Sequence, residues 1–228
     1  MNGHRTAAII CLLIIIPLSI QAESDDARKL RNAMETLAQI AAIPEGGIPS
    51  ALLANARGIA VLPGTVKAGC VLGGRYGTGV LSIQNADGTW SLPAFITLAG
   101  GSLGWQIGAQ GTDIILVFKS RKGIDAIGNG KLTLGADIAI AVGPVGRQAS
   151  AATDIELKAE IYSYSRARGL FAGLALEGAL LRLDEKANHA WYGTGSNPES
   201  ILTAAPPRVP EEAKGFSAEL KKLMVPRR

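Results

Sequence analysis

The stretch Glu160 to Gly178, EIYSYSRARGLFAGLALEG, decides the fold expected for this chain. From Asp154 onward apolar and polar side chains alternate strictly, and this period of two is typical of a half-buried β-strand. Gly169 interrupts the pattern, since glycine adopts the backbone angles of turns, and the apolar run Leu170 to Leu183 then predicts a second strand. The stretch therefore predicts an antiparallel hairpin with two arginines at its tip, Arg166 and Arg168.

Further strand-like runs fill the middle of the chain, and glycine or proline residues separate them. These runs cover residues 59–61, 66–72, 80–83, 90–98, 103–118 and 132–142. Glycines within strands indicate bulges or tight curvature, and there is no regular alternation of helices with strands that would favour a parallel sheet. We therefore expect an α+β fold in which a curved, largely antiparallel, glycine-rich and barrel-like β-sheet is flanked by N-terminal and C-terminal helices.

Helices are predicted at both ends of the strand region. Residues 24–42 and 211–224 have apolar side chains at spacings of three and four, which is the pattern of a helix with one buried face. Ser24 or Asp25 is suited to cap the first of these helices, and Ser50 to cap a short one that ends at Arg57. Another short helix is expected over residues 122–130. The predicted domain covers residues 23–205, and residues 206–228 form a proline-containing linker and the C-terminal amphipathic helix.

The first 22 residues have the layout of a secretory signal peptide. A short positive segment with Arg5 precedes an apolar run from Ala7 to Ile16, and Ala22 offers a small residue for cleavage. The run is shorter than the roughly 20 residues of a spanning helix, and an uncleaved anchor is the alternative. We expect an exported protein that is periplasmic or envelope-associated, with an extracellular location as a further option. The one cysteine after the leader, Cys70, then excludes an internal disulfide.

One motif invites a catalytic interpretation. Residues 100–104 fit the G-x-S-x-G nucleophile elbow around Ser102, and Asp137 or Asp154 followed by His189 gives an acceptable triad order. The elbow requires a helix after the motif, whereas the sequence that follows reads as a strand, so we expect no enzyme and keep a Ser102 hydrolase as the weakest alternative. His189 is expected in a solvated turn. One histidine and one apolar cysteine after the leader do not make a zinc site, and neither a metal nor a cofactor is expected.

Basic residues near the predicted strand ends are the binding candidates. The net charge of the chain, +4, is too mild for the dense basic stripe of a nucleic-acid-binding protein, but it is compatible with an anionic lipid surface. Arginine forks match phosphate oxygens, and binding residues collect on loops. A solvated or locally paired surface charge is the alternative for each. The candidates for a phosphate headgroup are Arg75, Lys119, Arg121, Lys122, Arg147, Arg166 and Arg168.

Five stretches together resemble the SYLF domain family. They are GIAVLPGTVKAG (Gly58 to Gly69), GGRYGTGVL (Gly73 to Leu81), SLGWQIGAQGTDIILVF (Ser102 to Phe118), LGADIAIAVGPVGR (Leu134 to Arg147) and the opening stretch. The resemblance runs from about Asp25 to Gly193, which is nearly all of the chain after the leader.

The resemblance to the SYLF family implies a lipid-binding module that prefers phosphoinositides. The family occurs in exported bacterial proteins and in eukaryotic proteins of cortical actin patches and endocytosis, and some yeast members bind actin. For an exported protein, the implied ligand is anionic phospholipid at a membrane surface rather than actin or a phosphoinositide. The family implies no catalytic residue. A structural envelope protein that works through protein contacts is the second hypothesis.

Overall fold

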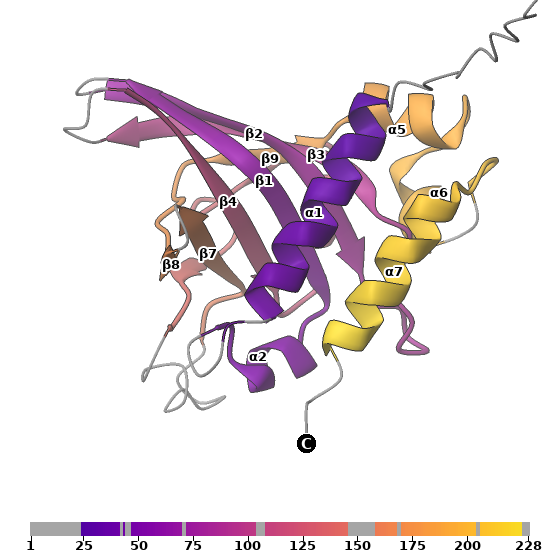
Figure 1. Ribbon diagram of the computed structural model, residues 1–228, viewed down its shortest axis with the longest axis horizontal. Helices are drawn as coiled ribbons and strands as arrows, with labels where there is room; N and C mark the ends of the chain where they lie inside the picture. Colours follow the sequence, from indigo (N-terminus) through magenta and orange to yellow (C-terminus); the bar gives the residue numbers. More distant parts are fainter. Residues whose placement is uncertain are drawn as a thin grey trace, which may run out of the picture.

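The computed structural model describes residues 24–41, 43, 47–69, 72–103, 108–145, 158–167, 170–203 and 206–224. The predicted signal peptide and Cys70 lie outside these ranges. Within them, one nine-stranded sheet curls into a half-barrel, and helices cover one of its faces and one of its ends (Figure 1). The fold class predicted from the sequence is therefore confirmed.

The strand order of the sheet is β5-β9-β3-β2-β1-β4-β7-β6, and β8 also pairs with β7. All pairs are antiparallel except β6 with β7. The strands are β1 (Gly58–Gly69), β2 (Leu72–Ile83), β3 (Ala94–Leu103), β4 (Gly108–Phe118), β5 (Leu132–Thr133), β6 (Ile140–Val142), β7 (Ile161–Ala167), β8 (Leu170–Gly173) and β9 (Leu180–Leu183). The four long strands β1 to β4 form the framework, and their outer halves project beyond the helices (Figure 1).

A bulge in the middle of β1 bends this framework. The pairing of β1 shifts register between Leu62 and Thr65 against β4, and Pro63 and Gly64 are the residues between them. Gly64 has a φ of 57°, a left-handed conformation that glycine adopts without strain. On the neighbouring strand, a Cβ at Gly79 would lie 2.0 Å from a backbone oxygen of β1, so only glycine fits there. The expectation of curvature from glycines within strands is confirmed at these positions.

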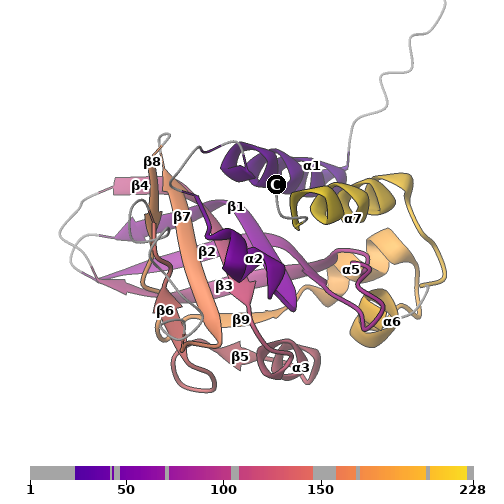
Figure 2. The same cartoon turned by 90° about the horizontal axis from the view of Figure 1, so that it is seen from below.

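The N-terminal helix α1 (Asp25–Ala41) and the C-terminal helix α7 (Glu211–Met224) pack side by side on the same face of the sheet (Figures 1 and 2). The Ser24 hydroxyl accepts the Ala27 N–H at 3.1 Å and caps α1 as predicted. The remaining helices are α2 (Ser50–Ala54), α3 (Lys122–Gly128), α5 (Glu185–Tyr192) and α6 (Pro198–Thr203). No helix in the described ranges is long and apolar enough to cross a membrane.

The buried faces of α1 and α7 join the apolar core above the sheet. Their buried side chains include Leu30, Leu37, Phe216 and Leu220. Ser217 of α7 donates a hydrogen bond of 2.7 Å to a backbone oxygen of the segment before β3, which fixes α7 to the sheet. The C-terminal helix is thus an integral layer of the described fold.

The hairpin predicted from the opening stretch is only partly correct. β7 and β8 pair as expected, but β8 ends at Gly173, and the rest of the apolar run crosses to the opposite edge of the sheet. There β9 pairs with β3 after a turn at Gly178, whose φ is 79°. The single strand predicted over Leu170 to Leu183 is wrong, because β3 has an open edge that β9 fills.

Other strand predictions also differ from the structure. The run 66–72 includes the end of β1 and the start of β2, and the run 90–98 begins four residues before β3. Both faces of β7 are buried from Ile161 to Tyr164, because the chain at Gly143 packs directly against the Tyr164 ring on the face expected to be polar. The half-buried assignment is therefore wrong for this part of the strand. The run 132–142 is divided between β5 and β6, since residues 135–137 form a turn.

Two helix details also need correction. The helix α2 begins at Ser50 but ends at Ala54, and no side chain caps its start, where Pro49 holds the N-cap position. His189 was expected in a solvated turn, but it lies exposed on α5. The Asp184 carboxylate caps α5 by accepting the Ala187 N–H at 3.1 Å, which explains why the helix forms there.

Candidate functional site

Several basic residues meet where β1 begins and where β2 and β4 end. The antiparallel register places Gly58 opposite Ile83 of β2 and opposite Phe118 of β4. Residues just outside these three strand ends are consequently neighbours, although they are far apart in the sequence. We call this cluster the basic end of the sheet; it consists of Arg57, Gln84, Lys119, Arg121 and Lys122.

Two guanidinium groups converge on Gln84. Arg57 Nη1 donates to the side-chain Oε1 of Gln84 at 3.0 Å, and Arg121 Nη1 donates to the backbone oxygen of the same residue at 3.2 Å. The Gln84 N–H in turn donates to the Arg57 carbonyl at 2.9 Å, which fixes the local backbone. Both arginines are exposed, and their shared partner is uncharged.

Among the described residues, acidic side chains leave the two arginines of the basic end without an ion pair. Within the part of the chain that the structure describes, no carboxylate lies within ion-pair distance of the Arg57 or Arg121 guanidinium. Lys122 Nζ is 3.7 Å from a Glu160 carboxylate oxygen, but the lysine side chain is 78% exposed. A surface ion pair of this kind contributes little. Arg57, Arg121 and Lys122 therefore present positively charged donors to the solvent.

The other predicted headgroup residues are not part of this cluster. Arg166 forms a forked ion pair with Asp113, with Nη2 at 2.7 Å and Nε at 3.2 Å from Oδ2. Arg75 lies toward the opposite end of β2 and donates to the Ala175 carbonyl at 3.2 Å, and burial lowers the pKa of its guanidinium. Arg147 and Arg168 lie outside the described residues. The structure thus brings together three of the seven predicted residues, Lys119, Arg121 and Lys122.

Comparison with known proteins gives the family. A family model described as "Ysc84: Las17-binding protein actin regulator" matches residues 99–223. The chain belongs to the Ysc84 (SYLF) family. It is 32% identical to Protein YSC84 of Saccharomyces cerevisiae over 191 residues, covering 82% of this chain and 40% of that protein. It is 33% identical to human SH3 domain-containing YSC84-like protein 1 over 195 residues, or 85% of this chain and 56% of that protein.

A relative in Xenopus laevis, also named SH3 domain-containing YSC84-like protein 1, is 35% identical over 179 residues, covering 78% of this chain and 53% of that protein. The chain spans about half the length of these curated members of the Ysc84 family, between 40% and 56%. The SYLF resemblance noted in the sequence is confirmed. The family description and these names denote a binding protein, a regulator or a domain composition, and none denotes a reaction.

Two of the candidate triad residues, Ser102 and Asp137, belong to a strand and a turn of the sheet. The backbone of Ser102 lies in β3 opposite Gly73, and β3 continues to Leu103, so Ser102 lies within a paired strand and not at the strand-to-helix turn that a nucleophile elbow requires. The Asp137 carboxylate accepts the Thr133 N–H at 2.6 Å and closes a turn. Asp154 lies outside the described residues. No group of three potential metal-ligating side chains is found in the described ranges.

Sequence analysis missed two residues of the basic end, Arg57 and Gln84. Arg57 was assigned to the end of a short helix and Gln84 directly follows the predicted run 80–83, and neither position suggested binding. Their proximity follows from the register of β1 with β2. The available signal was the position of Arg57 directly before a long strand. Using this signal would have required knowing which other strand ends lie beside Arg57.

Proposed function

We propose that this chain is a non-catalytic member of the Ysc84 family that binds anionic phospholipid at a membrane surface. The observation that carries the proposal is the convergence of Arg57 and Arg121 on one uncharged residue, Gln84. Neither guanidinium has a carboxylate partner among the described residues. In the same proposal, the protein is exported and reaches the membrane from the envelope side, as its N-terminal sequence predicts.

Phosphate chemistry fits the basic end. A phospholipid headgroup offers several acceptor oxygens, and a guanidinium presents a rigid fork of donors that matches them. Each of these arginines uses one Nη1 donor on Gln84, which leaves further N–H groups for a ligand. Basic residues near an anionic leaflet contribute about 1 kcal/mol each, so the two arginines together correspond to roughly a thirtyfold gain in partitioning.

Vesicle co-sedimentation tests the proposal with a matched pair of variants. Arg57→Gln with Arg121→Gln removes both converging charges, whereas Arg28→Gln with Arg208→Gln removes two exposed arginines elsewhere on the molecule. We expect the unmodified protein to bind phosphatidylglycerol-containing vesicles and not neutral ones. The first double variant should lose at least tenfold in binding and the second less than twofold. Equal partitioning to neutral and anionic vesicles, or none to either, contradicts the proposal.

A protein partner is the second candidate. It is favoured by the name of a further Saccharomyces cerevisiae relative, LAS seventeen-binding protein 3, which is 32% identical over 82% of this chain and of which the chain covers 41%. In this case the chain acts as a structural envelope protein through protein contacts. Binding to isolated envelope proteins that persists after complete lipid removal, together with no vesicle binding, distinguishes this function from the first.

A further inference from the structure

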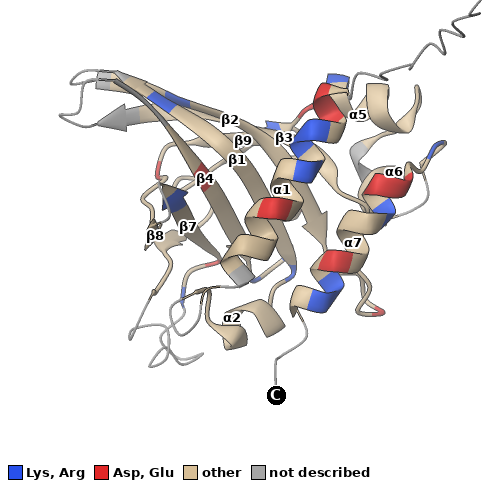
Figure 3. Cartoon of the chain, in the orientation of Figure 1, with Lys and Arg blue, Asp and Glu red and all other residues tan. Residues whose placement is uncertain are grey.

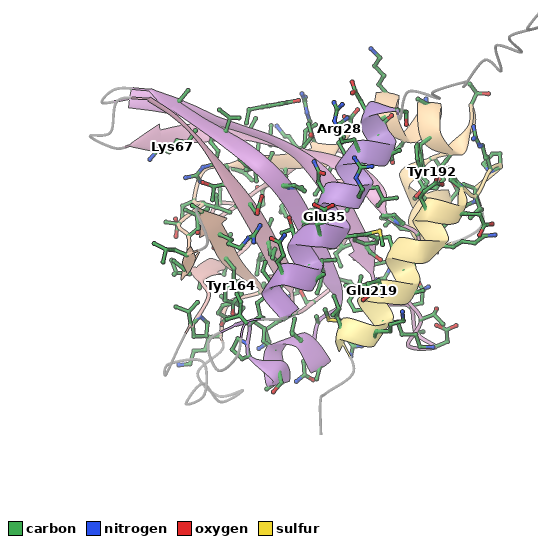
Figure 4. The ribbon with its side chains drawn as sticks, viewed as in Figure 1. Arg28, Glu35, Lys67, Tyr164, Tyr192 and Glu219 are labelled. Carbon is green, nitrogen blue, oxygen red and sulfur yellow. The ribbon has the colours of Figure 1, made fainter. Side chains whose placement is uncertain are left out.

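The projecting outer part of the four long strands carries an exposed apolar pair. We call this part the wing; it consists of the residues beyond the bulge of β1, namely 65–69, 72–77, 98–103 and 108–112. Val66 and Tyr76 are direct cross-strand partners on the wing, and they are 46% and 56% exposed. Figure 4, in which Lys67 is labelled on the wing, shows that this part of the sheet extends away from the helices.

The face of the wing that bears this pair is open. Val66 is opposite Gly111 in β4, and Tyr76 is opposite Ala99 in β3, so their lateral neighbours have at most a methyl group. A Cβ at Gly111 would meet no atom within 4 Å, and the same holds for Gly74, two residues from Tyr76 on the same face. The aromatic ring and the valine therefore lie over neighbours with small side chains and stay largely exposed among the residues that the structure describes.

Charge on the wing is of one sign. Lys67 and Arg75 are cross-strand partners one position along from the apolar pair, so they point to the other face, and the described residues of the wing include no carboxylate. Figure 3 shows basic and no acidic colour on the outer parts of β1 and β2. The wing thus has an apolar face that includes a tyrosine and positive charge on its other face. This combination matches the interfacial layer of an anionic bilayer, where tyrosine is enriched.

The size of the face excludes a stable contact with a second copy. Four strands about 4.8 Å apart, each contributing about five residues of 3.3 Å, give a face on the order of 300 Å². A stable protein interface needs about 800 Å² from each partner. Shallow contact with a bilayer has no such requirement, because single aromatic and aliphatic side chains already gain from it.

We propose, on the basis of the lipid-binding function above, that the wing inserts Val66 and Tyr76 into the interfacial layer of an anionic membrane. This contact is separate from the basic end, because the nine residue steps of extended chain from Arg57 to Val66 span up to about 30 Å. The basic end supplies the preference for anionic lipid, and the wing supplies an apolar contribution that salt does not screen.

The test compares two pairs of exposed apolar residues on phosphatidylglycerol-containing vesicles. Val66→Ser with Tyr76→Ser changes the wing, and Val142→Ser with Leu170→Ser is the matched control, since these are the other exposed large hydrophobic residues of the described chain. The wing variant should lose about tenfold in partitioning, and its residual binding should disappear at 0.5 M salt, whereas the control should change less than twofold. Tyr76→Trp, which keeps an interfacial aromatic group, should bind at least as well as the unmodified protein.

The possible results separate the two proposals. If the wing variant binds like the control while Arg57→Gln with Arg121→Gln still abolishes binding, the wing proposal is overturned and the lipid-binding function stands. If Tyr76→Trp weakens binding as strongly as the serine variant, interfacial insertion is also overturned. If the unmodified protein binds no vesicle, both proposals fail. Circular dichroism and melting curves of each variant confirm that these exposed substitutions leave the fold intact.

Discussion

Replacing Asp113 by alanine should loosen the junction at which the sheet bends. Asp113 Oδ1 accepts the N–H of Gly64 at 2.9 Å, inside the bulge of β1. Its other oxygen accepts two N–H groups of Arg166, so one carboxylate connects the bulge, β4 and β7. The two side chains are only 19% and 25% exposed, and the pair is therefore shielded better than a typical surface ion pair.

The expected cost follows from what remains after the substitution. Asp113→Ala removes a forked, charge-assisted interaction and leaves Arg166 half-buried without its carboxylate. It also removes the acceptor of the Gly64 N–H, and together these losses should lower the free energy of unfolding by about 3 kcal/mol. For a domain of this size, 1 kcal/mol corresponds to a shift of roughly 2–4 °C, so the melting temperature should fall by about 10 °C.

Thermal melts and urea titrations of a double-mutant cycle measure the interaction. Asp113→Ala and Arg166→Ala should each destabilise the protein, and the double variant should be more stable than additivity predicts by about 1–2 kcal/mol. Asp25→Ala, which breaks an exposed ion pair with Arg28 on α1, is the control and should cost less than about 1 kcal/mol. Strictly additive effects, or a change at Asp113 no larger than that of the control, would refute the reasoning.

Two further predictions concern the packed side of the sheet. Gly79→Ala places a methyl group 2.0 Å from a backbone oxygen of β1 and should prevent stable folding. Gly74→Ala is the control, because its methyl group meets open space and should change the urea midpoint little. Equal effects of the two substitutions contradict the expected clash. Burial raises the pKa of Tyr192, whose hydroxyl donates to the Pro93 carbonyl at 2.6 Å. Its stabilising contribution is therefore present below the ordinary tyrosine pKa of about 10 and is lost as the pH rises above it. Tyr192→Phe should be less stable at pH 8 but should lose less stability between pH 9.5 and 11, and an unchanged slope in urea titrations contradicts this.

The framework of the fold was predictable because its signals are local. Strands β1 to β4 follow apolar runs that glycines punctuate, and α1 and α7 follow helical periodicity with buried residues at the expected spacing. The division of the run after Leu170 into β8 and β9 was not predictable in the same way. Both pieces are apolar, and their partners are decided by which edges of the sheet remain open after the long strands have paired.

In the candidate site, too, residues were predictable from their local sequence position but their neighbours were not. Lys119, Arg121 and Lys122 follow a strand end, and that position alone suggested them. Arg57 became a neighbour of Arg121 only through the register of β1 and β4, which involves residues about 60 positions apart. Likewise, no local pattern indicated that Arg166 would face Asp113, because this ion pair depends on the register of β4 with β7.

In the proposed function, the basic end and the wing act over different ranges. Uncompensated guanidinium groups attract an anionic surface over about one Debye length, roughly 8 Å at physiological salt, whereas Val66 and Tyr76 contribute only on contact. The charges therefore orient the molecule before the apolar pair reaches the interface. Because β1 begins beside the basic end and ends in the wing, the bulge between the two surfaces sets the angle at which each would meet the membrane. Asp113 accepts a hydrogen bond from that bulge, so in this proposal its ion pair with Arg166, at the hairpin tip, helps to fix the angle between the two surfaces.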